Sequence, residues 1–396
     1  MIPLSLGSTL NEEPILDAGA SRHPPTRILF IDLLRGLAAV TMIEAHVFNS
    51  MLRADLRQSG WFPTLDFLNG LIAPVFLFVS GWVFAFSSER KIEEFRKGGT
   101  GLRNQLLRIV FVWALGYALH FPSLSLRNLR LFNQAGGWQE LHRVDILHSI
   151  AAGLLILLVT RLWIRSNLLW EALLYSSAAF LVAVAPLCWD SNSASALPAI
   201  LAGYIGDYHR SLFPLLPWLA FLLLGSACSV RFARAGVRGS PAMMQMLAGL
   251  GIVLLSSGYM FASYGFPWRY GSENIRVHPF FFISHLGGTL LLLWICWSWE
   301  QHRLPYPRWL QILSQESLLV YAGHICILYR VALNGRSLGS TYSKQLGIVE
   351  CLALMTFLVG VMWAAAKLWA SLKKRNRALA RGIALASVPF IAVVLG

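Results

Sequence analysis

Four ionisable residues lie within one apolar stretch near the start of the chain, at residues 29–50: Asp32, Arg35, Glu44 and His46. Such groups are costly inside lipid unless they meet a partner or a wet cavity. Asp32 and Arg35 are three residues apart and share a helix face, as a structural ion pair would. Arg35 also suits an anion site, because its guanidinium fork matches phosphate or carboxylate. His46 is the residue best able to take up and return a proton near neutral pH, although a lone histidine is often a packing residue.

More titratable side chains are expected at the ends of apolar segments on the same side as His46. The sequence places these at Asp66, His120, Asp145, His148, His278 and His285. His324 and Glu316 lie deeper, and Glu316 is expected to pair with a lysine or arginine. No histidine pair has HxH or HxxxH spacing, so no metal site is predicted. The five cysteines form no CxxC pair, which argues against zinc and against a disulfide framework.

The composition indicates lipid as the solvent for most of the surface. Hydrophobic residues make up 56% of the 396 residues and charged residues 13%, about half the charged share of a soluble domain. The net charge of +14 is spread in short basic runs between apolar segments, so nucleic acid is not an expected partner.

The apolar runs predict an all-α polytopic bundle of about ten transmembrane helices, because a helical span needs about 20 apolar residues. The expected spans lie near 29–50, 66–87, 104–121, 145–163, 168–188, 212–230, 243–262, 280–299, 309–330 and 346–370. The tail 382–396 fits an eleventh span, a half-span or an interfacial helix. The organisation expected is a disordered cytosolic tail at 1–27, a membrane domain at 28–370, and a basic segment with an apolar helix at 371–396.

Basic residues set the expected orientation. With a cytosolic N-terminus, the inner loops hold roughly twice as many lysines and arginines as the outer ones, which is the usual bias. Asp66, His148, His285 and Glu44 then face outward, and Arg103 and Arg108 lie on the cytosolic side. Without a cleaved targeting segment, the first span is expected to act as the anchor in a bacterial plasma membrane.

Several segments resemble, in order, the motifs of the heparan-alpha-glucosaminide N-acetyltransferase catalytic-domain family and, more loosely, the acyltransferase type-three family. The opening RILFIDLLRGLAAVTMIEAH runs from Arg27 to His46, and APVFLFVSG follows from Ala73. The later segments begin at Arg103 (RNQLLRIVFVWALGYALHF), Asp145 (DILHSIAAGLLIL), Phe213 (FPLLPWLAFLLLG) and Leu313 (LSQESLLVYAGHICILY). The resemblance covers roughly residues 27–330.

The resemblance implies transfer of an acyl group, typically acetyl from acetyl-CoA, to a sugar across the membrane, with a histidine at the centre of the site. It carries the opening motif onto Asp32, Arg35 and Gly36, the histidine onto His46, and later positions onto Asp145 and His324. The other matches are Pro74, Gly81, Gly153, Pro214, Pro217 and Gly225. The chain departs from bacterial relatives at Ala45, where they often carry an acid directly before the histidine.

The resulting hypothesis is a membrane acyltransferase that modifies an amine or hydroxyl of a glycan or glycolipid. His46 would be the base, with His324 and Asp145 orienting it. Arg35, with Asp32 and Gly36 beside it, and the basic residues Arg103 and Arg108 would hold the CoA phosphates. The alternatives are a transporter that uses buried Glu44, Arg35 and Glu316 as a relay, and a membrane scaffold. Acceptor, acyl length and a homo-oligomeric state stay open.

Overall fold

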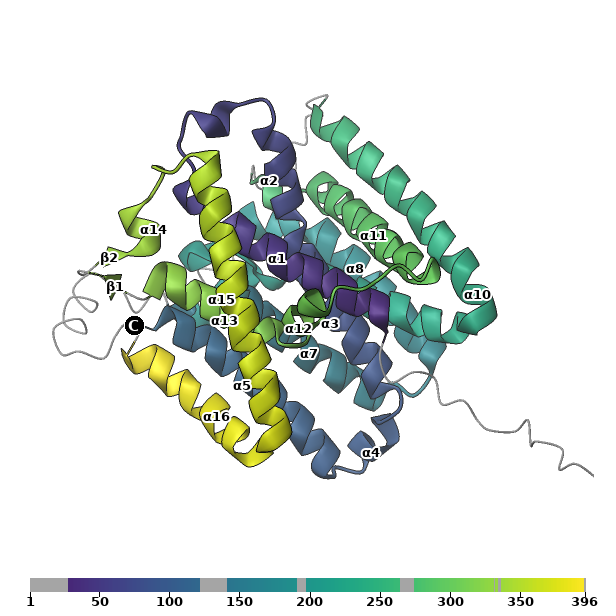
Figure 1. Cartoon of the computed structure of the whole chain (residues 1–396). Helices are drawn as coiled ribbons and strands as arrows, with labels where there is room; N and C mark the ends of the chain where they lie inside the picture. The colour runs from purple at the N-terminus through teal and green to yellow at the C-terminus, as the bar shows by residue number, and fades with distance from the viewer. Residues whose placement is uncertain are drawn as a thin grey trace, which may run out of the picture.

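The computed structural model describes residues 28–121, 141–190, 197–263, 274–330, 332–333 and 336–394. Within these residues the chain is a bundle of helices, with one short antiparallel pair of two-residue strands, β1 (Ala332–Leu333) and β2 (Arg336–Ser337) (Figure 1). The predicted tail at 1–27 lies outside the described residues. The prediction of an all-α bundle is confirmed for the part of the chain that is described.

Nearly every expected span corresponds to a long helix. These helices are α1 (Leu29–Met51), α3 (Ile72–Ser88), α5 (Thr100–His120), α7 (Ile146–Trp163), α8 (Asn167–Asp190), α10 (Leu215–Ser263), α11 (Pro279–Gln301), α15 (Ile348–Arg375) and α16 (Arg377–Val394). Shorter elements connect them: η1 (Leu56–Gln58), α2 (Phe62–Gly70), α4 (Ile92–Arg96), α9 (Ala199–Ile205), η4 (Tyr208–Arg210), η5 (Ile275–Val277), α12 (Arg308–Gln315), α13 (Ser317–Ile325), the π-helical turn η6 (Cys326–Arg330) and α14 (Leu338–Thr341).

Six helical segments of the described chain are long and apolar enough to cross a membrane, and a bent pair of helices makes a seventh candidate. This supports a membrane bundle. The count of about ten spans and the cytosolic N-terminus stay predictions. Two expected spans, 212–230 and 243–262, lie in one element, α10, which is interrupted at Gly236 (φ 62°). Glycine suits this interruption because its backbone enters the left-handed region at little cost.

The expected span at 309–330 is broken. Helices α12 and α13 meet at Glu316 with a bend of 79°, and the chain then tightens into the π-helical turn η6. Pro74 lies in the first turn of α3, where few backbone donors need helical partners. The apolar tail begins as helix α16 at Arg377 and packs against α5 and α15.

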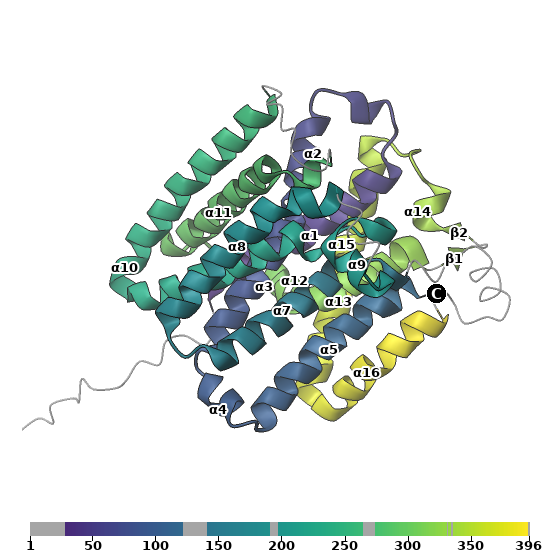
Figure 2. The same cartoon turned by 180° about the vertical axis from the view of Figure 1, so that it is seen from behind.

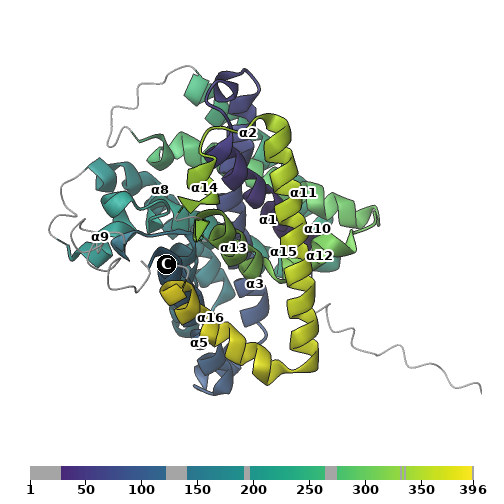
Figure 3. The same cartoon turned by 60° about the vertical axis from the view of Figure 1, so that its left-hand side comes forward.

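The centre of the bundle is formed where α10 packs against α3, α11 and α8. Figures 2 and 3 show the same bundle from behind and from the side, with α15 along its outer face and α16 turning back toward α5. Gly81 of α3 and Gly225 of α10 face each other's helix so closely that a Cβ on either would collide with backbone atoms of the other. Small residues allow such close crossings in membranes, and the hydroxyl of Ser226 donates to the carbonyl of Gly81 at 3.0 Å.

Candidate functional site: a cavity beside the first helix

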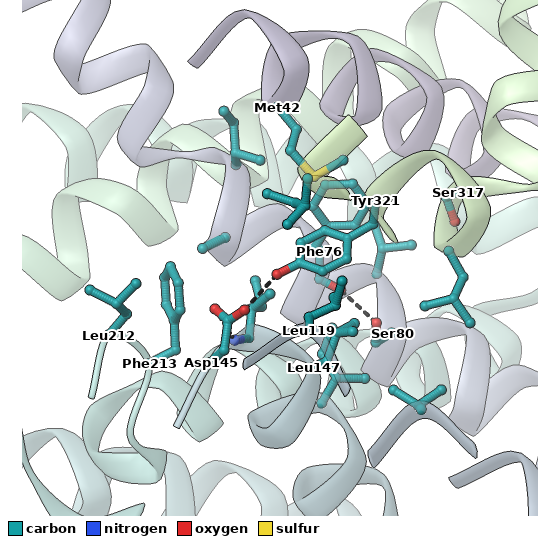
Figure 4. A pocket seen from close by; sticks show the side chains of 18 of the residues that line it. Met42, Phe76, Ser80, Leu119, Asp145, Leu147, Leu212, Phe213, Ser317 and Tyr321 are labelled. Atoms are coloured by element: carbon teal, nitrogen blue, oxygen red, sulfur yellow. Dashed lines mark hydrogen bonds between the residues drawn. The ribbon is translucent and has the colours of Figure 1, made fainter. Parts of the chain in front are cut away.

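A cavity of about 890 Å³ lies beside α1, within the size range of small-molecule sites. Its walls come from α1, α3, α5, α7 and the α13–η6 segment, so elements far apart in the sequence enclose it. Figure 4 shows Met42, Phe76, Asp145, Ser317 and Tyr321 around this space. Most of the wall is apolar, and polar side chains gather toward two ends, here called the Arg35 end and the His46 end.

The Arg35 end collects residues from the start of α1, α5 and α13 and from the last turns of α3. Its other polar lining residues are Ser87, Gln105, Arg108 and Ser317. The guanidinium of Arg35 donates to Asp32 Oδ1 at 3.0 Å and to Ser314 Oγ at 3.3 Å. Asp32 is buried, and Arg35 itself lines the cavity. The ion pair and the cavity position therefore coexist, so the two interpretations of Arg35 do not exclude each other.

The His46 end collects residues from the ends of α1, α2 and α5, the segment before α7, and η6. Its polar lining residues are His46, Asn49, Asn69, His120, Arg143, Asp145, Tyr329 and Arg330. The Tyr329 hydroxyl lies 3.4 Å from His46 Nδ1 and donates to the His46 carbonyl at 3.2 Å. The ring of His324 lies 5.1 Å from that of His46, centroid to centroid. His324 itself is fully buried and packs behind His46, outside the cavity lining.

Asp145 caps the first turn of α7 and points into the cavity. Its Oδ1 accepts from the backbone N–H of Ile146 at 2.7 Å, and its Oδ2 accepts from the Tyr321 hydroxyl at 2.7 Å. His120 Nε2 is 3.9 Å from the same Oδ2. The Asp145 backbone N–H donates to His148 Nδ1 at 3.2 Å, which completes a capping box. The carboxylate is thus fixed by α7 and α13 together.

The remaining predicted site residues lie outside the cavity lining. Asp66 and Arg103 are exposed, and His148 is buried behind Asp145, where it holds the turn. Glu44 accepts a hydrogen bond from the side chain of Asn69 at 3.5 Å. Asn69 lines the cavity, and Glu44 does not. Gly36 packs against Leu310, leaving too little space for a Cβ.

His285 occupies a packing position rather than the cavity. Its ring stacks on Phe281 with centroids 3.8 Å apart, and Phe67 lies 5.1 Å away. Its Nδ1 is 2.8 Å from the carbonyl of Phe281. Glu316, the deep acid of the ninth predicted span, pairs with Lys373 of α15 at 2.5 Å, as expected for it.

Sequence reasoning missed five polar residues that line the cavity at or beside the His46 end, namely Asn69, Arg143, Tyr321, Tyr329 and Arg330. Tyr329 and Arg330 end a predicted span, where such residues usually serve as interfacial anchors, so their types gave no signal. Asn49 was also missed, but it follows His46 by three residues and so shares its helix face.

The model of the family described as "Heparan-alpha-glucosaminide N-acetyltransferase, catalytic" matches residues 27–260, more than half of the chain. The chain belongs to this family. No curated protein matches the chain. Membership in this N-acetyltransferase family identifies a membrane acetyltransferase, and the predicted resemblance is confirmed. The matched region contains Arg35, His46 and Asp145, whereas His324, Tyr321, Tyr329 and Arg330 lie beyond it.

Proposed function

We propose that this member of the N-acetyltransferase family moves an acetyl or other acyl group from cytosolic acyl-CoA to an amine or hydroxyl of a sugar on the outward face of a bacterial plasma membrane. The observation that carries the proposal is the cavity that Arg35 and His46 share. The two residues are eleven positions apart on α1, which is three helical turns and about 16 Å along the axis. They therefore lie on one face of the helix, at different depths.

The Arg35 end is suited to the phosphates of the donor. Arg35 and Arg108 place two guanidinium groups at this end, and Ser87, Gln105 and Ser317 add neutral hydrogen-bonding groups. Guanidinium groups bind phosphate through paired, charge-assisted hydrogen bonds. Asp32 offsets part of the Arg35 charge and fixes its position. A thioester arm that entered here would extend along the apolar middle of the cavity toward His46.

At the other end His46 acts as the general base. Its unprotonated ring nitrogen takes a proton from the acceptor amine or hydroxyl, whose freed lone pair forms a bond to the acyl carbon. The carbon–sulfur bond of the thioester breaks, and the CoA thiolate leaves with its electron pair. The imidazolium then returns the proton to that thiolate, so the products are the acylated sugar and free CoA. Asp145 and the buried His324 orient the groups around this exchange.

The deciding experiment replaces His46 and measures transfer in membrane vesicles loaded with radiolabelled acetyl-CoA on the cytosolic side. His46→Ala should lower the labelling of membrane glycans by about a hundredfold or more, the usual contribution of a general base. His302→Ala is the matched control, because His302 is exposed at the end of α11, and it should leave labelling unchanged. Full labelling by His46→Ala would remove this residue from the mechanism.

The same vesicles separate the acyltransferase from a transporter. A transporter without chemistry would move its substrate but would neither bind a non-hydrolysable CoA analogue nor label any glycan. We expect the wild-type protein to bind the CoA analogue and the Arg35→Gln variant to bind it more weakly. Absence of analogue binding by the wild-type protein would overturn the proposed function.

A further inference from the structure

Tyr329 lies beside His46 because the end of α13 changes its winding. The turn Cys326–Arg330 is π-helical, a rare form of helix that occurs often at functional sites. Its Tyr329 ring rests on Gly339 of α14, where a Cβ would come within 2.9 Å of the ring. The two rings of Tyr329 and His46 meet edge to face, with centroids 5.8 Å apart.

The hydrogen bonds of Tyr329 determine which way its hydroxyl proton points. A tyrosine hydroxyl has one proton and also accepts. Its oxygen lies 3.2 Å from the carbonyl oxygen of His46 and 3.4 Å from His46 Nδ1. A carbonyl only accepts, so the shorter contact uses the hydroxyl proton. The contact with Nδ1 is then a hydrogen bond only if Nδ1 carries the proton and donates it.

The neighbouring histidine agrees with this assignment. His324 Nδ1 lies 2.6 Å from the carbonyl of Val320 and must donate to it, so its Nε2 carries a lone pair in the neutral ring. That Nε2 is buried and makes no hydrogen bond within the described part of the chain. The two histidine rings are tilted by 53° with centroids 5.1 Å apart, and His324 Nε2 makes no hydrogen bond to His46, so His324 does not compete with Tyr329 for a nitrogen of His46.

We infer that Tyr329 is a positioning residue that holds neutral His46 as its Nδ1–H tautomer, leaving Nε2 with the lone pair. The consequence of this tautomer for catalysis rests on the proposed function. If His46 is the base, Nε2 is the nitrogen that receives the proton of the acceptor. Tyr329 also holds the carbonyl of His46, so one hydroxyl fixes the ring's tautomer and its backbone together. Tyr329 itself touches neither bond that forms or breaks.

Nitrogen NMR of the full-length protein in lipid nanodiscs tests the tautomer directly, with ¹⁵N-labelled histidine. The His46 signals are assigned as those lost in His46→Gln. In the wild type, Nδ1 should show the protonated shift and Nε2 the unprotonated one. Tyr329→Phe should move His46 toward a mixture of tautomers. A wild-type signal from the Nε2–H form, or an unchanged signal in Tyr329→Phe, would overturn the inference.

Tyr342→Phe is the matched control. Tyr342 is exposed at the end of α14, so this variant also removes a tyrosine hydroxyl but leaves the contacts of His46 in place. Tyr342→Phe should keep the His46 nitrogen shifts at their wild-type values. If both variants moved these shifts equally, the effect of Tyr329→Phe would not come from its contact with His46, and the inference would fail.

Activity provides a second, separable readout. Tyr329→Phe should lower kcat by about two- to tenfold, the factor for one neutral hydrogen bond, with the KM for acetyl-CoA unchanged. A change in KM with unchanged kcat would contradict a role beside the base. If the wild-type protein transfers no acyl group, the proposed function fails, while the NMR result still decides the tautomer.

Discussion

Arg35 joins three features in the first turns of α1. It pairs with Asp32, donates to Ser314 beside the bend between α12 and α13, and lines the cavity. A charged donor that already has two acceptors has a fixed direction, which suits binding of an anion in one orientation. Asp32 is an anionic partner that holds the guanidinium in place.

Replacement of Arg35 should therefore weaken binding of the acyl donor more than it slows the transfer step. Arg35→Gln is expected to raise the KM for acetyl-CoA by about tenfold to a hundredfold, since a hydrogen bond to a charged group contributes about 1.5–3 kcal/mol. Steady-state transfer rates at varied acetyl-CoA measure this. Arg238→Gln is the control, because Arg238 is exposed near the interruption of α10, and its KM should stay at the wild-type value. An unchanged KM in Arg35→Gln would move the phosphate site elsewhere.

How far the site could be predicted depends on whether its residues share one helix. Arg35 and His46 lie on one face of α1 because eleven residues make three turns, so their shared face follows from the sequence, whereas the cavity along it depends on the other helices. Tyr321 and Asp145 meet only because α13 and α7 pack together. Nothing in either segment alone signals that contact. His285 shows the reverse case, since its position predicted a substrate role, while its ring contacts Phe281 and Phe67 outside the cavity lining.

At the scale of helices, the closest crossing is that of α3 and α10. Gly81 and Gly225 allow the two backbones to approach so closely that a Cβ on either would collide with the other helix. Helix α3 also lines the cavity. Hydropathy predicted both helices but gave no information on how closely they approach, which depends on matched small residues in segments far apart in the sequence.

A larger residue at the crossing should separate the two helices. Gly225→Val is expected to destabilise the protein by about 1–3 kcal/mol or more, as overpacking of a tight interior does. Thermal unfolding in detergent, followed by tryptophan fluorescence, measures the loss. Gly360→Val is the control, because a Cβ at Gly360 in α15 would meet nothing within 4 Å beyond its own stretch of helix. Equal melting temperatures for the two variants would contradict the close crossing.

The bend at Glu316 is the element that hydropathy did not reveal. Residues 309–330 are apolar enough for one straight span, yet the chain turns by 79° there. The pair between Glu316 and Lys373 holds α15 at this bend, and Ser314 and Ser317 on either side contact Arg35 or the cavity. Glu316 thus lies at a sharp bend of the chain, and its pairing with Lys373 on a later helix explains why a buried acid stands there.

At the scale of the molecule, the two ends of the cavity belong to opposite ends of the helices that line it. If the N-terminus is cytosolic, as the basic loops predict, the Arg35 end faces the cytosol and the His46 end faces outward. Orientation therefore decides which substrate reaches which group, and it can be measured without any knowledge of activity.

Single cysteines, introduced after the five native cysteines are replaced by alanine, report that orientation in intact cells. Gln58→Cys, exposed in the η1 loop next to the His46 end, should react with a membrane-impermeant maleimide added outside. Arg238→Cys, exposed at the far end of the bundle, should react only after the cells are permeabilised. The reverse pattern would place the N-terminus outside and reverse the direction of transfer.

The cavity wall joins the region that matches the family, residues 27–260, with residues 317–330, which lie beyond it. A graft of the matched region from a relative onto this chain would pair a foreign base and donor site with native Tyr321, Tyr329 and Arg330. The His46 end of the cavity would then combine residues from two different proteins. Exchange of specificity between such enzymes should therefore require transfer of the α13–η6 segment together with the early helices.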